Sequence, residues 1–272
     1  MKKLVGTLTA LILITSCGPK QFYERTETGL EYYFFEKNDG GKTGDKGDIY
    51  NLNITAMTRH DSVVFQERAM FQRSEPIYPG DFHEGLGMLR EKDSAAFKLS
   101  VDSFFTLHNL SIPRGLENDS MFKLHIGVVA ILNPFEHTIY KSEQELAQMK
   151  KFVERKAWTT QTDTTGIMYE IVKSNDQGEL LEEGDSVALT YIYSTLDDRV
   201  IERTREGDAW SYKIGGQQTR VAGLDRLLTL MRNGEKARAL IPFTEAFGEE
   251  GFGALIPPYT TLVIELSAEK EK

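Results

Sequence analysis

The chain has 272 residues, 40% of them hydrophobic and 27% charged, a composition typical of a globular protein. Its length allows two domains of about 100 residues each. Acidic residues outnumber basic ones by 41 to 32, giving a formal net charge of −9, which is unsuited to nucleic acid or an anionic bilayer as a partner.

The N-terminus, MKKLVGTLTALILITSC, combines a basic start, an apolar stretch and small residues before a cysteine. Because the apolar stretch is too short to span a bilayer, it predicts a secretory signal over residues 1–16. Its end, Leu13–Cys17, resembles the lipobox of bacterial lipoproteins, in which the cysteine becomes the acylated first residue. We therefore expect an envelope lipoprotein anchored through Cys17, in the outer membrane facing the periplasm; the alternative is a chance thiol. Cys17 is the only cysteine, so no internal disulfide can form.

Residues 17–28 are polar and predict a tether. An internal repeat follows: GLEYYFFEKNDGGKTGDKGD from Gly29 aligns without a gap with GIMYEIVKSNDQGELLEEGD from Gly166. Repetition at a fixed offset indicates two copies of one fold, which we place at residues 29–132 and 166–272.

The first copy carries a strand in which Tyr50, Leu52, Ile54 and Ala56 alternate with polar residues. Further strands are expected from Val63, over SAAFKLSV and over MFKLHIGVVAI, with a helix around Phe82 to Leu89. Gly85 and Gly87 weaken that helix by about 1 kcal/mol each relative to alanine.

Residues 133–165 are expected to join the copies. Ser142-Glu143-Gln144-Glu145 is a capping box that predicts a helix from Ser142 to about Arg155, followed by a polar linker over Thr159–Thr165. The helix has an apolar stripe of Leu146, Met149, Phe152 and Val153. We expect this stripe to pack against its own chain; a homodimer through the 142–155 helix is the alternative.

The second copy has the clearest periodicity. Three strands show alternating apolar side chains, namely Val187, Leu189, Tyr191 and Tyr193, then Trp210, Tyr212 and Ile214, then Leu262, Ile264 and Leu266. Between them one helix carries a stripe of Leu224, Leu227, Leu228 and Met231 and ends at Asn233-Gly234. An antiparallel sheet covered by one short helix is a two-layer α+β fold.

Several motifs of this copy resemble the FKBP-type peptidyl-prolyl isomerases: GDSV, the following Tyr191, VAGLD through NGEKA, AFGEEGFG directly before IPP, and TTLVIEL. The resemblance implies two tandem domains, each a half-barrel sheet around one short helix, and a shallow aromatic cleft in the second that takes an Xaa-Pro peptide. In the first copy Ile54 stands in place of Tyr191, and Gln66 in place of the family's acid. We expect little or no isomerase activity there.

Prolyl isomerisation needs no nucleophile, metal or cofactor. The barrier is roughly 18 to 20 kcal/mol because amide resonance must be broken. An apolar, water-poor cleft favours the twisted amide, and one or two hydrogen-bond donors hold the peptide. No metal or cofactor is expected, and the five histidines show no ligand spacing.

The resemblance implies which residues form the cleft. The catalytic group is Tyr191, Glu202, Trp210, Val221 and Phe247, and the substrate-binding group is Ile201, Leu224, Phe252, Leu255, Ile256 and Ile264. Tyr191 would hydrogen-bond the Glu202 carboxylate, and the backbone N–H of Ile256 would be a donor. Trp210, Val221, Leu224 and Ile264 would also serve as core residues in any such fold.

Four positions depart from the family pattern. Ile201 stands for phenylalanine, Glu202 for aspartate, Leu224 for a floor tryptophan and Phe247 for a loop tyrosine. They predict a wider, less aromatic cleft with one donor fewer.

These features predict a peptidyl-prolyl cis-trans isomerase that assists folding of exported proteins in the cell envelope, with proline-containing client chains as partners. The second copy would be catalytic and the first would bind clients. One alternative is a non-catalytic chaperone or scaffold whose clefts only bind. Another is a structural subunit of an envelope complex.

Overall fold

The computed structural model describes residues 22–205, 207–216, 219 and 221–271. The expected signal sequence and Cys17 lie outside these residues. Two compact units divide after Pro134, and each is described by itself. Among the described residues no helix is both long and apolar enough to cross a membrane.

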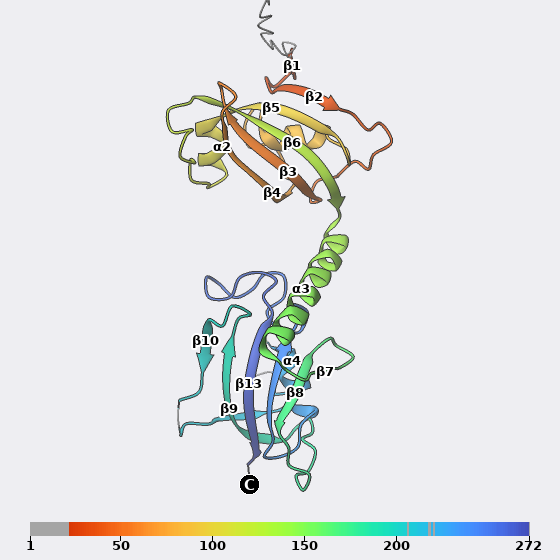
Figure 1. Ribbon diagram of the computed structural model, residues 1–272, viewed down its shortest axis with the longest axis vertical. Coiled ribbons are helices and arrows are strands. Elements are labelled where there is room, and N and C mark those ends of the chain that lie inside the picture. Colours follow the sequence, from red (N-terminus) through yellow and green to blue (C-terminus); the bar gives the residue numbers. More distant parts are fainter. Residues whose placement is uncertain (1–21, 206, 217–218, 220, 272) are drawn as a thin grey trace, which may run out of the picture. The chain divides into compact units, whose positions relative to one another are not determined.

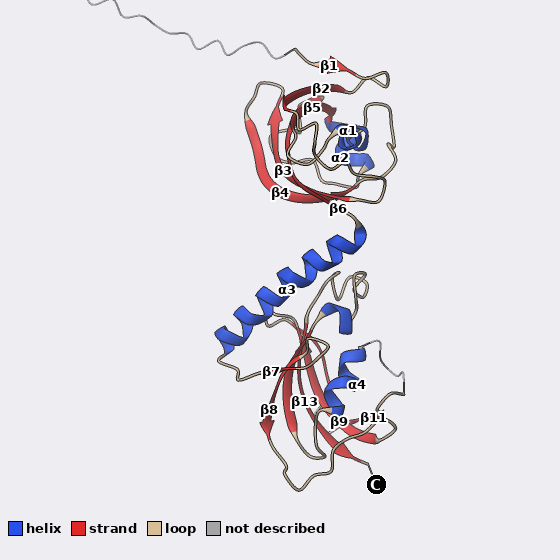
Figure 2. Ribbon diagram, turned by 90° about the vertical axis from the view of Figure 1, so that its right-hand side faces the viewer, coloured by secondary structure: helices blue, strands red, loops and turns tan. Residues whose placement is uncertain are grey.

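The first unit is one antiparallel sheet with two short helices on the same side (Figures 1 and 2). Its strands are β1 (Glu24–Arg25), β2 (Glu31–Glu36), β3 (Ile49–Thr58), β4 (Val63–Gln72), β5 (Ser94–Ser100) and β6 (Met121–Leu132), in the order β1-β2-β5-β6-β3-β4. The helices are α1 (Phe82–Met88) and α2 (Val101–Leu107).

The alternation expected in β3 is confirmed, because Tyr50, Leu52, Ile54 and Ala56 are all buried in the core. The predicted tether over residues 17–28 extends too far, because Glu24 and Arg25 form strand β1 and pair with β2. In α1, a Cβ on Gly85 would lie 2.9 Å from the Phe97 ring. The glycine that weakens this helix therefore also lets it approach the sheet closely.

The second unit is a more complete half-barrel. Its strands are β7 (Gln161–Thr162), β8 (Met168–Lys173), β9 (Ser186–Ser194), β10 (Val200–Arg203), β11 (Trp210–Lys213), β12 (Lys236–Ile241) and β13 (Leu262–Lys270). All pairs are antiparallel in the order β10-β9-β13-β12-β8-β7, with β11 also paired to β9. The helices are α3 (Pro134–Lys156), α4 (Ala222–Thr229) and the 3-10 turn η1 (Phe243–Glu245).

The predicted start of the joining helix at Ser142 is wrong, because α3 begins at Pro134. Proline suits the first helical turn, where its missing N–H would have no partner. Ser142 therefore lies within a continuing helix.

Glu145 does not cap the helix. Its buried carboxylate accepts hydrogen bonds from the Phe243 N–H (2.8 Å) and the Thr261 hydroxyl (2.6 Å). Burial raises the pKa of this carboxyl, and the two hydrogen bonds oppose that shift.

The apolar stripe of α3 packs on its own unit, as expected. Met149 and Phe152 are buried against Met168, Leu240 and Val263, which face outward from the sheet. In Figure 2, α3 and α4 lie on opposite sides of this sheet. The buried part of the stripe is therefore unavailable for a homodimer, although Leu146 remains 42% exposed. The segment 133–165 contributes both α3 and β7 to the second unit.

Candidate active site

The inner side of the second sheet holds a cavity of about 390 Å³. It is lined by Tyr191, Tyr193, Ile201, Glu202, Trp210, Thr219, Val221, Phe247, Ile256 and Leu262. Seven of these ten residues were expected from the sequence. Strands β9, β10 and β11, the start of α4 and the loop before β13 all contribute, so residues far apart in the chain meet at one cleft.

Strand alternation and a bulge aim the side chains. On β9, Tyr191 and Tyr193 are two residues apart and therefore lie on the same face of the sheet. On β10 the register shifts between Val200 and Glu202, so Ile201 has no direct partner. A bulge of this kind re-aims side chains, and here consecutive residues, Ile201 and Glu202, both reach the cleft.

The polar pair expected at the cleft is present. The Tyr191 hydroxyl donates a hydrogen bond of 2.9 Å to Glu202 Oε1. Burial, followed by this bond and the nearby negative charge, raises the pKa of Tyr191 to about 12. The phenol therefore stays protonated over the physiological range and holds the carboxylate in place.

Aromatic rings form the walls. The Trp210 ring lies 5.9 Å from that of Tyr191 and 4.7 Å from that of Tyr212. Tyr212 is held in turn by a 2.6 Å hydrogen bond to Asp225 on α4. On the opposite loop Phe247 packs against Phe252 at 5.6 Å. The cleft thus has a fixed wall on the sheet and a second wall on the glycine-rich loop.

Four expected residues do not line the cavity. Leu224 and Ile264 are fully buried in the core, Leu224 on the face of α4 that packs against the sheet. Phe252 and Leu255 lie on the loop and are each 47% exposed. The structure therefore does not bring Leu224 and Ile264 into the cavity, because core packing uses their side chains.

The expected backbone donor is also engaged elsewhere. The Ile256 N–H donates to the Phe252 carbonyl oxygen at 3.2 Å, and the Phe252 N–H donates to the Ile256 carbonyl oxygen at 2.7 Å. The Val221 N–H donates to the Thr219 hydroxyl oxygen at 3.1 Å. Both backbone amides at this edge are thus used to shape the loops.

Sequence reasoning missed Tyr193, Thr219 and Leu262 as lining residues. Tyr193 shares a strand face with Tyr191, and this alternation is the sequence signal that could have placed it at the cleft. Its ring lies 4.9 Å from that of Tyr191, and its side chain is 8% exposed. Its hydroxyl is buried and has no hydrogen-bond partner in the part of the chain that the structure describes. Burial, and then the nearby acidic groups, raises the pKa of Tyr193 well above the usual tyrosine value.

The first unit lacks this arrangement. Ile54, which corresponds to Tyr191 in the repeat, is buried in the core, and Gln66 is exposed on β4. Within the described ranges, His, Cys, Asp and Glu side chains form no group of three that could hold a metal ion.

The comparisons with known proteins point to one family. Residues 178–268 match the model of the FKBP-type peptidyl-prolyl cis-trans isomerase family. A 22 kDa FKBP-type isomerase of Escherichia coli is 29% identical over 123 residues, 44% of this chain and 58% of that protein. FK506-binding protein 1 of Kluyveromyces lactis is 34% identical over 100 residues, 35% of this chain and 83% of that protein.

Among solved structures, FkpA from Escherichia coli is 24% identical, with a TM-score of 0.41, over 49% of this chain and 62% of that one. The match to the first relative spans little more than half of that protein, whereas most of the yeast protein is covered at over 30% identity. The chain belongs to the FKBP-type peptidyl-prolyl cis-trans isomerases.

Proposed function

We propose that the second unit accelerates prolyl cis-trans isomerisation in client chains exported to the bacterial cell envelope. The observation that carries the proposal is the hydrogen-bonded pair of Tyr191 and Glu202 beside a cavity walled by aromatic rings. The pair fixes the polar edge, and the rings exclude water from the centre.

The cleft acts on the amide by its environment. A planar prolyl amide carries separated charge across its C–N bond, and twisting the bond reduces that separation. An apolar site therefore favours the twisted amide over the planar one. Trp210, Val221 and Phe247 supply the apolar surface. No side chain needs to gain or lose a proton.

A donor is still needed to hold the peptide, and the structure leaves few candidates. Tyr191 donates to Glu202, and the amides of Val221 and Ile256 are engaged within the protein. Among the residues that the structure describes, the buried Tyr193 hydroxyl has no hydrogen-bond partner, a state that costs about 1–3 kcal/mol. We assign to Tyr193 the hydrogen bond to a carbonyl of the bound peptide.

The location rests on the N-terminal pattern. Leu13–Cys17 supports lipidation of Cys17, and more than one acyl chain would anchor the chain stably. The anchored protein would face the periplasm from the outer membrane. Intact mass of the mature wild type tests this: an unmodified Cys17 thiol would rule out the lipoprotein.

The activity is tested by isomerisation of an Xaa-Pro tetrapeptide with the full mature chain. Ile201→Arg places a charge in the cleft and should remove most of the acceleration. Val200→Arg is the matched control, because Val200 is 54% exposed and does not line the cavity. If the folded wild type gives no acceleration but still binds the peptide, the non-catalytic chaperone is the correct function.

A further inference from the structure

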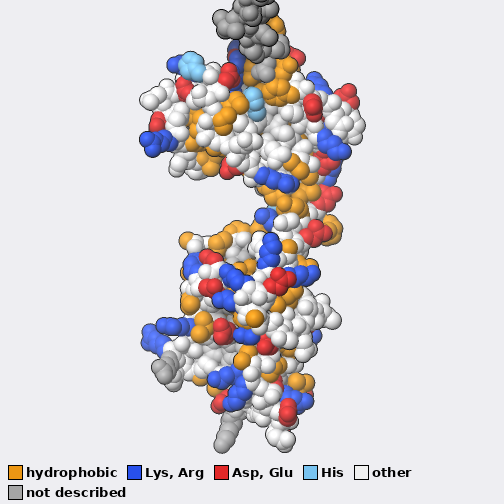
Figure 3. Space-filling view, in the orientation of Figure 1, with side chains coloured by type: hydrophobic (Ala, Val, Ile, Leu, Met, Phe, Trp, Pro, Cys, Tyr) orange, Lys and Arg blue, Asp and Glu red, His pale blue; other side chains and the backbone are white. Residues whose placement is uncertain are grey.

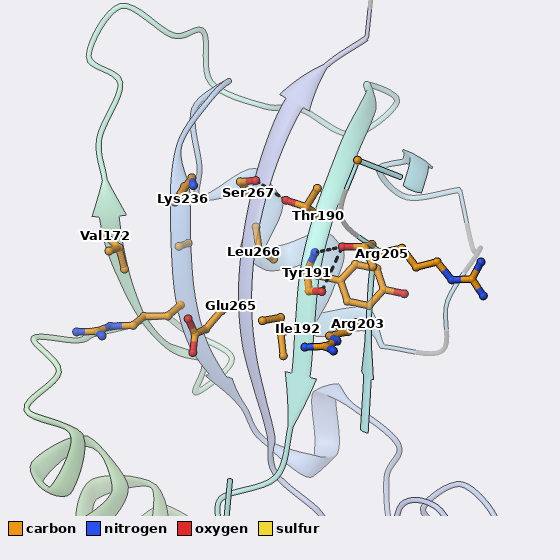
Figure 4. Close-up of a pocket in the computed structure, with 14 residues that line it drawn as sticks. Val172, Thr190, Tyr191, Ile192, Arg203, Arg205, Lys236, Glu265, Leu266 and Ser267 are labelled. Atoms are coloured by element: carbon orange, nitrogen blue, oxygen red, sulfur yellow. Dashed lines mark hydrogen bonds between the residues drawn. The ribbon is translucent and has the colours of Figure 1, made fainter. Parts of the chain in front are cut away.

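A second, larger cavity of about 810 Å³ lies in the second unit. It opens along the outer face of the sheet, the face that α3 covers only at one end through Met168, Leu240 and Val263. Its lining residues are Val172, Thr190, Tyr191, Ile192, Arg203, Thr204, Arg205, Gly207, Lys236, Ala237, Arg238, Glu265, Leu266 and Ser267. Figure 4 shows these side chains spread across the sheet, from Val172 on β8 through β12, β13 and β9 to Arg203 on β10. We call this surface the outer groove.

The outer groove is basic although the chain as a whole is acidic. It contains four basic residues, Arg203, Arg205, Lys236 and Arg238, and one acidic residue, Glu265. Arg238 is neutralised by Glu170 at 2.9 Å and lies over the Trp158 ring at 4.6 Å. In the described part of the chain, the other three basic side chains have no ion-pair partner. Figure 3 shows basic side chains at the β10 edge of this unit and again further along the sheet.

The strand register divides these charges between two flanks. Two neighbouring rows of paired residues cross the sheet from β12 towards β10. The first row consists of Arg238 on β12, Glu265 on β13, Ile192 on β9 and Arg203 on β10. The second consists of Lys236 on β12, Ser267 on β13 and Thr190 on β9. The basic groups therefore lie on β12 at one flank and on β10 and the segment after it at the other. Three strand spacings separate β12 from β10, which is about 14 Å.

The centre of the outer groove is different. Ile192 is 39% exposed there, and Thr190 and Ser267 hydrogen-bond each other at 2.6 Å. Glu265 lies between the two flanks, so a ligand that is negative along its whole length would be repelled at the centre. This arrangement disfavours a flat anionic membrane and favours a ligand with two separated negative ends.

We propose that the outer groove binds an extended segment of a partner protein in which two acidic residues flank an apolar one. In an extended chain, residues i and i+4 are about 13 Å apart and lie on the same side, with residue i+2 between them. The two acids then reach the basic flanks, and the central apolar side chain lies on Ile192. The recognised pattern is acid-x-apolar-x-acid.

The outer groove and the isomerase cleft lie on opposite faces of the same strands. Tyr191 borders both cavities, but its ring packs beside Trp210 and its hydroxyl bonds Glu202 on the cleft side. The next residues along the two strands, Ile192 and Arg203, line the groove and not the cleft. A chain bound in the groove would therefore be held beside the cleft without filling it. The binding itself does not depend on isomerase activity, so the two proposals fail separately.

The test measures fluorescence anisotropy of a labelled nonapeptide, Gly-Ser-Glu-Ala-Leu-Ala-Glu-Ser-Gly, with the full mature chain. We expect saturable binding that weakens as salt is raised. The double variant Arg203→Glu with Lys236→Glu should bind at least about tenfold more weakly, because both flanks then repel the peptide. The matched control, Lys150→Glu with Lys151→Glu, changes the same charge on α3 outside the groove and should bind like the wild type.

Two further peptides test the pattern. A peptide with Glu-Leu-Glu at its centre has the same charge at closer spacing and should bind several times more weakly, and one with Lys in place of both Glu should not bind. Tetrapeptide isomerisation should be equal in wild type and double variant. Equal affinity for both acidic spacings, or no loss in the double variant, would overturn the proposal. Self-association of the wild type that the groove variant loses would also overturn the proposal, because the occupant would then be a second copy of the chain. Preferential binding to vesicles of anionic lipid would overturn it as well.

Discussion

The two units place different residues on the same strand face. At matching repeat positions β3 carries Ile54 and Ala56, whereas β9 carries Tyr191 and Tyr193. In the first unit these side chains are buried in a continuous core, and in the second they line a cavity. One alternating strand can thus build either a core or a site, depending on two residues.

The first unit uses its aromatic rings for packing. Phe104 lies 5.6 Å from Phe82 and 5.3 Å from Phe122, and Phe105 packs beside it at 5.0 Å. Both residues come from α2, a helix that the sequence did not predict. In the second unit the rings of Trp210 and Phe247 instead line open space. The comparison predicts that aromatic truncation lowers activity in one unit and only stability in the other.

The largest expected difference in kcat/KM is between the variants Trp210→Ala and Phe104→Ala. Removing the Trp210 wall should lower kcat/KM about tenfold or more and the free energy of unfolding by about 2–4 kcal/mol. Phe104→Ala should cost about 3–5 kcal/mol and leave the activity of the folded fraction unchanged. Prolyl isomerisation rates and urea melts of the full chain measure both. A loss of activity in folded Phe104→Ala would show that the first unit contributes to catalysis.

Leu224→Trp tests the boundary between core and cleft in the second unit. The family resemblance suggests that tryptophan here would narrow the pocket and raise the rate. In the structure Leu224 is fully buried and does not line the cavity. We therefore expect overpacking that costs about 1–3 kcal/mol, with no gain in kcat/KM. A faster enzyme of unchanged stability would mean that the side chain reaches the substrate.

Tyr193→Phe tests the feature that Ala56 lacks. Deleting a hydrogen bond to the substrate should lower kcat/KM several-fold, corresponding to about 1 kcal/mol. The same deletion removes a buried hydroxyl that no described residue pairs with, so the free energy of unfolding should rise or stay equal. Phe247→Tyr restores the loop hydroxyl of the family pattern. It should raise kcat/KM more when it is added to Tyr193→Phe than when it is added to the wild type. If Tyr193→Phe changes stability but not kinetics, the hydroxyl has no role in binding.

The sequence predicted the α+β class, the repeat and most of the cleft, because strand alternation and local motifs specify them. It did not predict that Ile256 and Phe252 would use each other's backbone groups, since that bridge depends on how the glycine-rich loop folds. Tyr193 was missed because an alternating pattern does not distinguish a core position from a cavity wall. The start of α3 was misplaced because a capping box also occurs inside helices, where its Glu145 can bond elsewhere.

Glu145→Gln has the smallest expected effect. It concerns α3 of the second unit, a helix with no counterpart among the described residues of the first unit. Burial holds the folded-state pKa of Glu145 above the usual value of a glutamate carboxyl, so ionisation opposes folding. The stabilising contribution of the protonated carboxyl is present below pH 4.5 and is lost as pH rises through the folded pKa. At pH 7 the glutamine variant should therefore be more stable by up to about 1 kcal/mol, and this advantage should vanish on acidification.

Glu143→Gln is the control for this change, because Glu143 lies exposed on the same helix. Thermal melts at pH 4 and pH 7 measure the difference. Equal stability changes for the two variants at both pH values would contradict a burial cost at Glu145.

Strand β9 separates two surfaces by a single residue step, with Tyr191 and Tyr193 on one side and Thr190 and Ile192 on the other. A one-residue deletion within it would transfer the tyrosines to solvent and the outward residues into the core. Saturation mutagenesis should therefore give a tolerance profile with a period of two. Selection for isomerisation would constrain the odd-numbered positions, and selection for partner capture the even-numbered ones. Substitutions could then tune each trait separately, whereas insertions and deletions would damage both at once.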